Sequence, residues 1–366
     1  MKRMMMVFVF ALCTIPMLAQ FQHTRTPNDT LQTVRNLGGG RVAFSIYAPN
    51  AKTVGFGGDA MPWGQKLNFT RNDDGVWTVV VPGVKTGVYR YNFVVDGVTV
   101  QDPLAVGVIE NSALADIGSG KEFFDMRTDI PHGAMAERYY YSKTLKTMRR
   151  MHIWTPVGYE KSSEKLPVLY LIHGGGDNDA SWPGVGCAGN ILDNLMAEGK
   201  MNPMVVVMPN GSINSKDIGG EVPLFEKDLM TDIIPTVEGN YRVYTDPAHR
   251  AISGLSMGGM ETLQALLDDT EAFDYYWVLS SGWWYDAKTY PTYQKKLYDV
   301  AKKLGHVKQL VFTMGGEEDI AYKNCQQMLK LFDKANIKYE YKDATGGHTW
   351  YTWRNNLYDE AQRLFK

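Results

Sequence analysis

The chain has 366 residues, of which 44% are hydrophobic and 21% are charged, and its formal net charge is −2. This length suits roughly two domains of about 150 residues each, and the hydrophobic fraction is sufficient for packed cores. The near balance of charge excludes a basic nucleic-acid-binding face and a disordered polyelectrolyte. We therefore expect a folded globular protein with no nucleic-acid partner.

The first twenty residues, MKRMMMVFVFALCTIPMLAQ, have the composition of an export signal. Lys2 and Arg3 form a basic start, residues 4–18 are mainly apolar, and a small residue follows at Ala19. This order is typical of a secretory signal peptide, and the apolar run is shorter than the about 20 residues of a membrane span. We expect residues 1–19 to be removed and the protein to be secreted or periplasmic, without membrane insertion.

Three cysteines occur in the sequence, and one of them, Cys13, belongs to the expected signal peptide. The other two are Cys187 and Cys325. An exported compartment permits a disulfide between them, and two buried free thiols are the alternative. The sequence leaves both possibilities open, as it does the oligomeric state.

Residues 41–102 consist of short alternating runs such as RVAFSIYAP, GVWTVVVPGV and GVYRYNFVVDGVTVQDP. Period-2 alternation interrupted by Asp-Gly and Pro-Gly predicts a small antiparallel β domain, and the Asp96-Gly97 pair is a strong hairpin signal. We expect an immunoglobulin-like β-sandwich over residues 24–126. Within and after it, residues 104–131 lose the alternation and are interpreted as a linker.

The remainder of the chain, residues 127–366, alternates between short β-rich runs and helical patterns. LPVLYLI, MVVVM, WVLS and QLVFTM have the composition of buried strands, and NILDNLMAEG and FEKDLMTDIIPTVEGNY have that of helices. This order implies βαβ units and a mainly parallel sheet covered on both faces. The predicted fold class of this region is α/β.

One serine lies between two glycines at the junction of a predicted strand and a predicted helix, in the stretch RAISGLSMGGMETLQALL. Gly254-Leu255-Ser256-Met257-Gly258 fits the G-x-S-x-G nucleophile elbow, in which a tight turn exposes the serine and the glycines avoid collisions. The N-terminus of the following helix favours a developing anion. The motif alone occurs by chance, but this strand-turn-helix context favours Ser256 as a nucleophile.

A serine nucleophile requires a base, and the base requires an acid that orients it. His348 lies in the Gly-Gly loop TGGHTW after a short β-rich run, which is the position expected of such a base. Between the two, QLVFTMGGEEDI offers carboxylates in one turn, so that the order serine, acid, histidine matches that of α/β-hydrolases. The candidates for the acid, in chain order, are Glu317, Glu318, Asp319 and the less favoured Asp343.

Three glycines follow the predicted strand LYLI in the stretch LYLIHGGGDNDASW. Backbone N–H groups in such a loop can approach a carbonyl oxygen without side-chain obstruction. We assign the oxyanion hole to the N–H groups of Gly175 and Met257. No GK[ST] follows to suggest a phosphate loop, and no spaced ligand set accompanies His173 to suggest zinc, so we expect no metal and no cofactor.

Residues from about 132 to the end resemble carbohydrate esterase family 1, the feruloyl and acetylxylan esterases related to esterase D. The resemblance rests on LPVLYLIHGGGDNDASW, FEKDLMTDIIPTVEGNYRVYTDPAHRAISGLSMGGMETL, GEEDIAY and GGHTWYTWR. The N-terminal stretches YAPNAKTVGFGGD, DDGVWTVVV and GVYRYNFVVDG resemble carbohydrate-binding modules of family 48. The G-x-x-D turn of the esterases falls on Gly316 to Asp319 and implies Asp319 as the acid, although a frame one residue earlier would select Glu318.

The resemblance implies a secreted serine esterase that acts on feruloyl esters of plant cell-wall polysaccharide through an acyl-enzyme. Acetylxylan esterase and siderophore esterase are the alternatives, and an inactive carbohydrate-binding protein is a third. Flat aromatic side chains suit phenolic acids and sugar faces. Several aromatic residues, Trp353 among them, lie in the loops around the expected site. The residues proposed to bind substrate are Trp182, Trp283, Trp284, Tyr285 and Trp350. Whether the β domain binds glycan or only packs against the esterase stays open.

Overall fold

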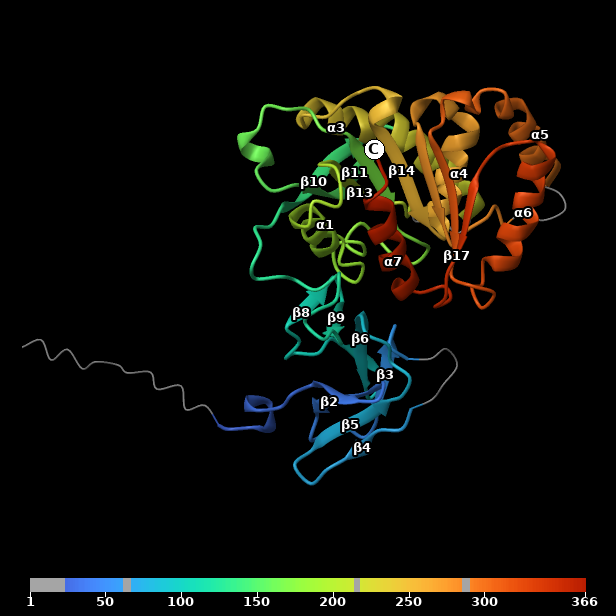
Figure 1. The fold of residues 1–366 in the computed structure, drawn as a ribbon. Helices are drawn as coiled ribbons and strands as arrows, with labels where there is room; N and C mark the ends of the chain where they lie inside the picture. The colour runs from blue at the N-terminus through green and yellow to red at the C-terminus, as the bar shows by residue number, and fades with distance from the viewer. Residues whose placement is uncertain (1–23, 62–66, 214–217, 285–289) are drawn as a thin grey trace, which may run out of the picture.

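A computed structural model describes residues 24–61, 67–213, 218–284 and 290–366. The chain forms a β-sandwich at its N-terminal side and a larger α/β domain that contains the C-terminus (Figure 1). The expected signal peptide, residues 1–19, lies outside the described residues. None of the helices in the described ranges is long and apolar enough to cross a membrane.

The β-sandwich consists of two antiparallel sheets. One has the strand order β1-β2-β5-β4, and the other has the order β3-β6-β9-β8 with β7 paired to β6. Their bounds are β1 Val34–Gly38, β2 Arg41–Tyr47, β3 Val54–Gly58, β4 Thr70–Arg71, β5 Val76–Val81, β6 Val88–Val95, β7 Val98–Val100, β8 Gly107–Ile109 and β9 Ser112–Asp116. The predicted fold class is confirmed for this domain.

Alternating residues of both sheets fill the space between them. Val42 and Phe44 of β2 face Tyr91 and Phe93 of β6 in one buried cluster, because successive side chains of a strand point to opposite faces. The predicted hairpin joins β6 to β7 with Val95 opposite Val98. Asp96 and Gly97 between them have φ values of 48° and 86°, the left-handed pair that a type I′ turn requires.

The expected linker is wrong over part of its length, because β8 and β9 lie inside it. They form a hairpin and pair with β6 through β9, for example Tyr91 opposite Ala113. Three-residue and five-residue strands are too short to show a clear alternation in sequence, and these gain their stability from the sheet that they extend. The segment therefore completes the sandwich beside the esterase domain.

The α/β domain has one eight-stranded sheet with the order β10-β11-β13-β12-β14-β15-β16-β17. Strands β10 and β11 are antiparallel to their neighbours, and the pairs from β13 to β17 are parallel. The bounds are β10 Ala134–Ser142, β11 Thr147–Thr155, β12 Val168–Ile172, β13 Val205–Pro209, β14 Arg250–Leu255, β15 Tyr275–Leu279, β16 Gln309–Met314 and β17 Glu340–Asp343. The predicted mainly parallel sheet is confirmed.

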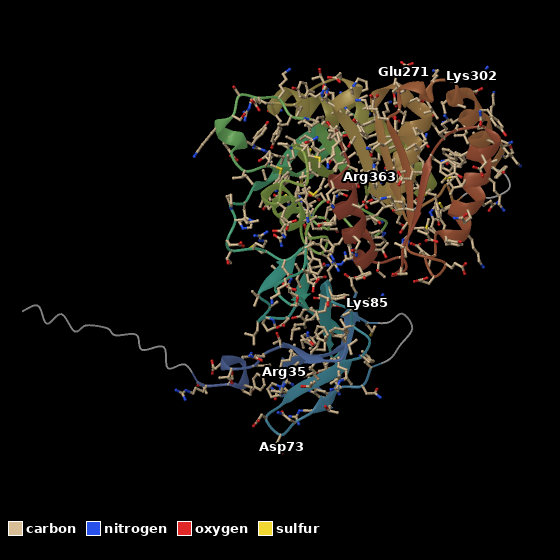
Figure 2. The ribbon with its side chains drawn as sticks, in the orientation of Figure 1. Arg35, Asp73, Lys85, Glu271, Lys302 and Arg363 are labelled. Carbon is tan, nitrogen blue, oxygen red and sulfur yellow. The ribbon has the colours of Figure 1, made fainter. Side chains whose placement is uncertain are left out.

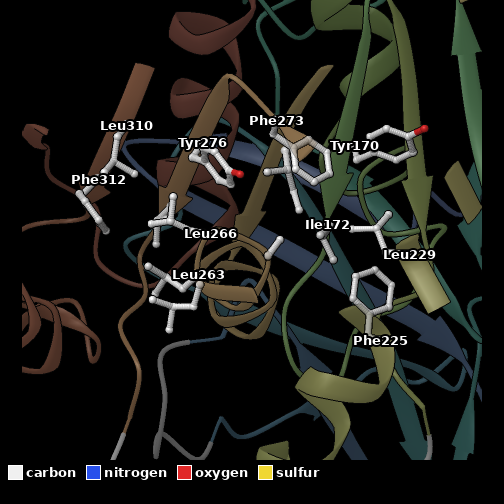
Figure 3. Packing of buried hydrophobic residues seen from close by; sticks show 14 of the residues in the cluster. Tyr170, Ile172, Phe225, Leu229, Leu263, Leu266, Phe273, Tyr276, Leu310 and Phe312 are labelled. Carbon is white, nitrogen blue, oxygen red and sulfur yellow. The ribbon is translucent and has the colours of Figure 1, made fainter. Parts of the chain in front are cut away.

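Helices cover both faces of this sheet. Residues of α2 to α6 pack on one face, in a buried cluster that includes Tyr170, Ile172, Phe273 and Phe312 (Figure 3), and α1 and α7 pack on the other. The helices are α1 Ala188–Ala197, α2 Ile218–Asp228, the π-helical turn η3 Leu229–Ile233, α3 Ile234–Asn240, α4 Met257–Asp268, α5 Tyr290–Ala301, α6 Tyr322–Lys334 and α7 Trp350–Ala361. Burial on both faces explains why these strands are continuously apolar in sequence.

The two domains meet through polar contacts as well as packing. The buried guanidinium of Arg354, on α7, donates to the carbonyl of Val88 in the β-sandwich at 3.2 Å. Lys85 lies at the junction of the two domains (Figure 2), with its ammonium 4.7 Å from the centroid of the Tyr351 ring. A Cβ on Gly87 would lie 2.3 Å from the guanidinium of Arg354, so a side chain at this position would displace it.

Candidate active site

Ser256 lies at the sharp turn between β14 and α4. Its backbone has φ 51° and ψ −111°, a sparsely populated conformation that costs of order 1–3 kcal/mol and marks functional sites. The flanking glycines permit the turn, because a Cβ on Gly254 would lie 2.1 Å from the carbonyl oxygen of Gly258, and one on Gly258 would lie 2.6 Å from that of His173. The sequence therefore forms the strained strand-turn-helix geometry of a nucleophile elbow.

His348 and Asp319 are in direct contact. The Nδ1 atom of His348 lies 2.9 Å from the Oδ1 atom of Asp319, which follows β16 and is 3% exposed. Burial alone would raise the pKa of the Asp319 carboxyl, but hydrogen bonds from His348 and from the N–H of Ala321 outweigh burial and lower that pKa. The carboxyl is therefore ionised at neutral pH and fixes the orientation of the imidazole.

The other carboxylates near this turn have different partners. Glu318 is exposed and accepts the N–H of Gly346 at 3.2 Å, and Asp343 accepts the N–H of Gly316 at 3.1 Å. These bonds hold the loop that carries the histidine, but neither carboxylate is bonded to its ring. The structure thus brings Asp319, and not its glutamate neighbour, to His348.

The loop after β12 lies against the nucleophile turn. A Cβ on Gly174 would lie 3.2 Å from the Cβ of Ser256, and one on Gly175 would lie 3.9 Å from that of Met257. Adjacent N–H groups are occupied, since Gly258 donates to the carbonyl of His173 at 3.1 Å. The N–H groups of Gly175 and Met257 have no acceptor among the described residues, so both are available to a ligand.

The buried imidazole of His173 holds this loop through a hydrogen bond to the carbonyl of Gly174. Its Nδ1 atom lies 2.8 Å from the carbonyl oxygen of Gly174, and its Nε2 atom lies 2.9 Å from the N–H of Gly211. A carbonyl accepts and an N–H donates, so the ring carries its proton on Nδ1. Burial lowers the pKa of His173 and favours this neutral form. The Gly174 carbonyl is fixed on one side of the peptide, and the N–H of Gly175 points to the other.

Ser256 and His348 line the same pocket, which has a volume of about 560 Å³ and lies between the two domains. The esterase side contributes the glycine loop, Leu255, Trp350, Tyr351 and Trp353. The ring of Trp353 contacts that of His348 edge to face, with centroids 5.0 Å apart. Among the described residues, no group of three or more His, Cys, Asp or Glu side chains has the arrangement of a metal site.

The predicted substrate-binding aromatics do not all reach this pocket. Trp350 lines it, whereas Trp182 is 1% exposed in the core and donates from its indole to the carbonyl of Ile172 at 3.2 Å. Trp283 is also buried and stacks on Tyr293 with centroids 5.1 Å apart. Neither Trp182 nor Trp283 is among the pocket residues, because their loops direct them inward. Trp284 is exposed and outside the pocket lining, and Tyr285 lies outside the described residues.

The second wall of the pocket belongs to the β-sandwich, and no sequence motif predicted it. Residues 58–61, 83–85 and 89–90 of that domain line the same cavity as Ser256. These segments lie on different strands and turns and contain no catalytic motif. Only docking of the two domains brings them to the site.

Comparison with known proteins agrees with this architecture. The sequence model of the family described as "Putative esterase" matches residues 142–364. The chain belongs to this esterase family. Residues 31–106 match carbohydrate-binding module 48, the isoamylase N-terminal domain. The predicted resemblance to carbohydrate esterases with a family 48 module is thereby confirmed, as is the assignment to the carboxylic ester hydrolases.

A curated relative is an endo-1,4-beta-xylanase/feruloyl esterase of Xylanibacter ruminicola, which is 33% identical over 345 residues. The alignment covers 89% of this chain and 45% of the relative, so the chain spans less than half the length of that protein. It likewise spans 22% of an endo-1,4-beta-xylanase Y of Acetivibrio thermocellus, at 25% identity.

Two solved structures describe the fold similarity. A ferulic acid esterase is 24% identical with a TM-score of 0.56, and the match covers 64% of this chain and 99% of that one. The enterobactin esterase of Shigella flexneri is 18% identical with a TM-score of 0.62, and here the match covers 91% of this chain and 95% of that one. The second match extends over both domains.

Proposed function

We propose that the protein is a secreted serine esterase that hydrolyses feruloyl esters on plant cell-wall polysaccharide such as arabinoxylan. The observation that carries the proposal is the 2.9 Å contact of His348 with a buried carboxylate in the pocket that also contains Ser256. The relative named as a xylanase/feruloyl esterase, which aligns with 89% of the chain, supports the acyl group. Secretion rests on the signal-like composition of residues 1–19.

The mechanism is two-step acyl transfer. Because Nδ1 of His348 is bonded to Asp319, its Nε2 is the nitrogen that takes the proton as the Ser256 hydroxyl attacks the ester carbonyl. The N–H groups of Gly175 and Met257 stabilise the oxyanion. The protonated imidazole then donates its proton to the leaving sugar oxygen, which leaves the acyl group on Ser256. In the second step the imidazole takes a proton from water, the water attacks the acyl-enzyme, and the imidazole returns the proton to Ser256 as the acid is released.

The aromatic lining of the pocket supports a phenolic acyl group. Tyr89, Tyr351 and Trp353 line it together with Leu255 and Met61. A feruloyl ring buries on the order of 150 Å², which at about 25 cal/mol per Å² is several kcal/mol before ordering costs. An acetyl group gains almost none of this, so we expect a higher kcat/KM for feruloyl than for acetyl esters.

A siderophore esterase is the second candidate, because the enterobactin esterase structure matches 91% of this chain across both domains. At 18% identity that match concerns the fold alone. The relative with the xylanase/feruloyl esterase name is 33% identical over nearly the same extent, which favours the polysaccharide ester.

The deciding experiment compares methyl ferulate, acetylated xylan and a tricatecholate ester with the purified full chain. We expect the highest kcat/KM for methyl ferulate and a rate decrease of roughly 10⁴–10⁶ for Ser256→Ala and His348→Ala. Ser163→Ala changes an exposed serine and is the matched control. Preference for acetylated xylan would assign the acetylxylan esterase, and hydrolysis of the tricatecholate alone would assign the siderophore esterase.

A variant of Ser256 or His348 with activity within tenfold of the original protein would overturn the catalytic assignment. Binding of arabinoxylan without hydrolysis of any ester would instead favour a carbohydrate-binding protein on an inactive esterase fold. Circular dichroism of each variant distinguishes a catalytic loss from unfolding.

A further inference from the structure

An arginine of the β-sandwich contacts the loop that carries Gly175. Arg90, on β6 of the β-sandwich, contacts Asp177 of the esterase loop and donates from Nε to Asp59 of its own domain at 2.7 Å. Asp177 has a side chain that is 9% exposed, against 24% for Arg90. The ion pair is therefore partly shielded from water, where it is worth more than an exposed surface pair.

Asp177 is connected to the oxyanion loop by its backbone. Its N–H donates to the carbonyl of Gly174 at 3.2 Å, and its carbonyl accepts the hydroxyl of Ser212 at 3.2 Å. The Gly174 carbonyl belongs to the same peptide group as the N–H of Gly175. Asp177 and His173 thus bond to the same Gly174 carbonyl, and both help to set the direction of that N–H.

The ion pair also affects the net charge of the pocket that contains Ser256. Asp59, Arg90 and Asp177 all line the pocket that contains Ser256, and together they carry one net negative charge. Without the guanidinium, the two carboxylates that it bonds would be left uncompensated in the pocket that contains Ser256. Uncompensated negative charge in the pocket disfavours a developing anion.

We propose that Arg90 is a positioning residue for the oxyanion hole, so that the β-sandwich contributes to the chemical step and not only to polysaccharide binding. The inference rests on the proposed serine esterase function. It implies that a minimal ester with no sugar, which cannot report on glycan contacts, still depends on a residue of the other domain.

The test measures kcat and KM of full-length variants with methyl ferulate. We expect Arg90→Gln to lower kcat by roughly 10-fold to 100-fold, below the roughly 10²–10³-fold loss for an oxyanion donor itself, with a smaller change in KM. Asp177→Asn removes the same tether from the esterase side but also removes one of the two carboxylates, so it should lower kcat by a smaller factor than Arg90→Gln. Arg71→Gln changes an exposed arginine of the same β domain whose side chain donates to the carbonyl of Pro49, and it should match the original protein.

A double-mutant cycle separates a tether from two independent effects. Since Arg90 and Asp177 act through one contact, the variant with both substitutions should be no slower than the slower single variant. Affinity for a boronic acid transition-state analogue should fall in parallel with kcat, whereas affinity for ferulate should change little. A purely structural role would not separate these two ligands.

Three results would overturn the inference: a kcat for Arg90→Gln within twofold of the original, an unaffected Asp177→Asn, or additive losses in the double variant. If Arg90→Gln fails to fold, Asp177→Asn decides the matter alone, since it leaves the β-sandwich unaltered. Activity of the original protein that Ser256→Ala abolishes, with no effect of Arg90, would contradict this inference only. Absence of hydrolysis of every ester would contradict the proposed function.

Discussion

The two walls of the pocket are held in different ways. On the esterase side, Ser256 and Gly175 follow buried strands and His348 lies in the loop after the edge strand β17. Backbone hydrogen bonds and tight glycine contacts hold these segments. On the β-sandwich side, Lys85 and Arg90 are polar side chains that are at least partly exposed to solvent. Lys85 is held by a ring contact, and Arg90 by ion pairs with Asp59 and Asp177. The first wall suits a catalytic step that requires fixed atomic positions. The second wall suits contacts with the substrate, because its side chains can move.

The largest effect should come from the acid on the esterase wall. Asp319→Asn removes the negative charge that orients His348 and stabilises its protonated form, so we expect kcat to fall by roughly 10⁴, as in the serine protease triad. Glu318→Gln, one residue earlier and exposed, should keep kcat within a few-fold. Steady-state kinetics with methyl ferulate compare the two, and a larger loss for Glu318→Gln would show that the acid lies in the other frame.

A second substitution tests whether the esterase wall depends on its buried support. His173→Asn places an amide N–H at the position of Nδ1, which donates to the Gly174 carbonyl. His173→Gln places its amide nearer to Nε2, which accepts the N–H of Gly211. We expect His173→Gln to approach the roughly 10²-fold loss for an oxyanion donor, and His173→Asn to lose less than about tenfold. Equal losses in kcat would mean that the imidazole serves the fold and not the direction of the Gly175 N–H.

The β-sandwich wall should give smaller effects that depend on the substrate. Lys85 lies 4.7 Å from the Tyr351 ring at the pocket, and such a contact contributes about 0.5–1 kcal/mol. Lys85 is exposed and lines the pocket, where the sugar of a larger substrate would contact it. Lys85→Gln should therefore raise KM for a feruloylated arabinoxylan fragment by roughly 2-fold to 5-fold, and KM for methyl ferulate by less. Lys52→Gln, at an exposed lysine of the same domain, is the control. Equal changes with both substrates would exclude a contact with the sugar.

The smallest effect should come from a buried carboxyl group that links α7 to strand β14. Glu360 of α7 is fully buried and accepts the hydroxyl of Ser253 at 2.9 Å, and burial raises its pKa well above the ordinary value. The folded state then holds the proton more tightly than the unfolded state, so stability is greatest below the ordinary pKa of about 4.3 and decreases as pH rises above it.

Glu360→Gln cannot ionise and should gain stability relative to the original protein as pH rises from 5 to 8. Each kcal/mol corresponds to about 2–4 °C in the melting temperature of a domain of this size. Thermal unfolding of both proteins at the two pH values provides the measurement. A melting-temperature difference that is the same at pH 5 and pH 8 would mean that Glu360 is ionised in the folded state.

Features that depend on residues close together in the sequence were predictable. The elbow around Ser256, the glycine loop and the order of strands and helices follow from local composition and spacing. The predicted fold class and family agree with the structure and with the comparisons. The side-chain direction of Trp283 was not predictable, because it depends on packing against Tyr293 and Phe332 from distant helices.

The choice between neighbouring carboxylates needed three-dimensional information. Gly316 has φ 92°, and this turn directs the Asp319 side chain inward and that of Glu318 outward. The wall formed by Lys85 and Arg90 arises only when two domains associate, and no sequence pattern within either domain encodes it. The catalytic and binding roles of these residues remain predictions for the variants above.

Cys187 and Cys325 are both buried and both free. Burial raises the pKa of each thiol to about 12, so neither is a thiolate at neutral pH, and the thiolate is the form that reacts. The described residues therefore reach their final covalent state without an oxidation step. A chain with this arrangement can be produced in a reducing cytoplasm and assayed in the presence of thiol reductants without loss of a structural bond.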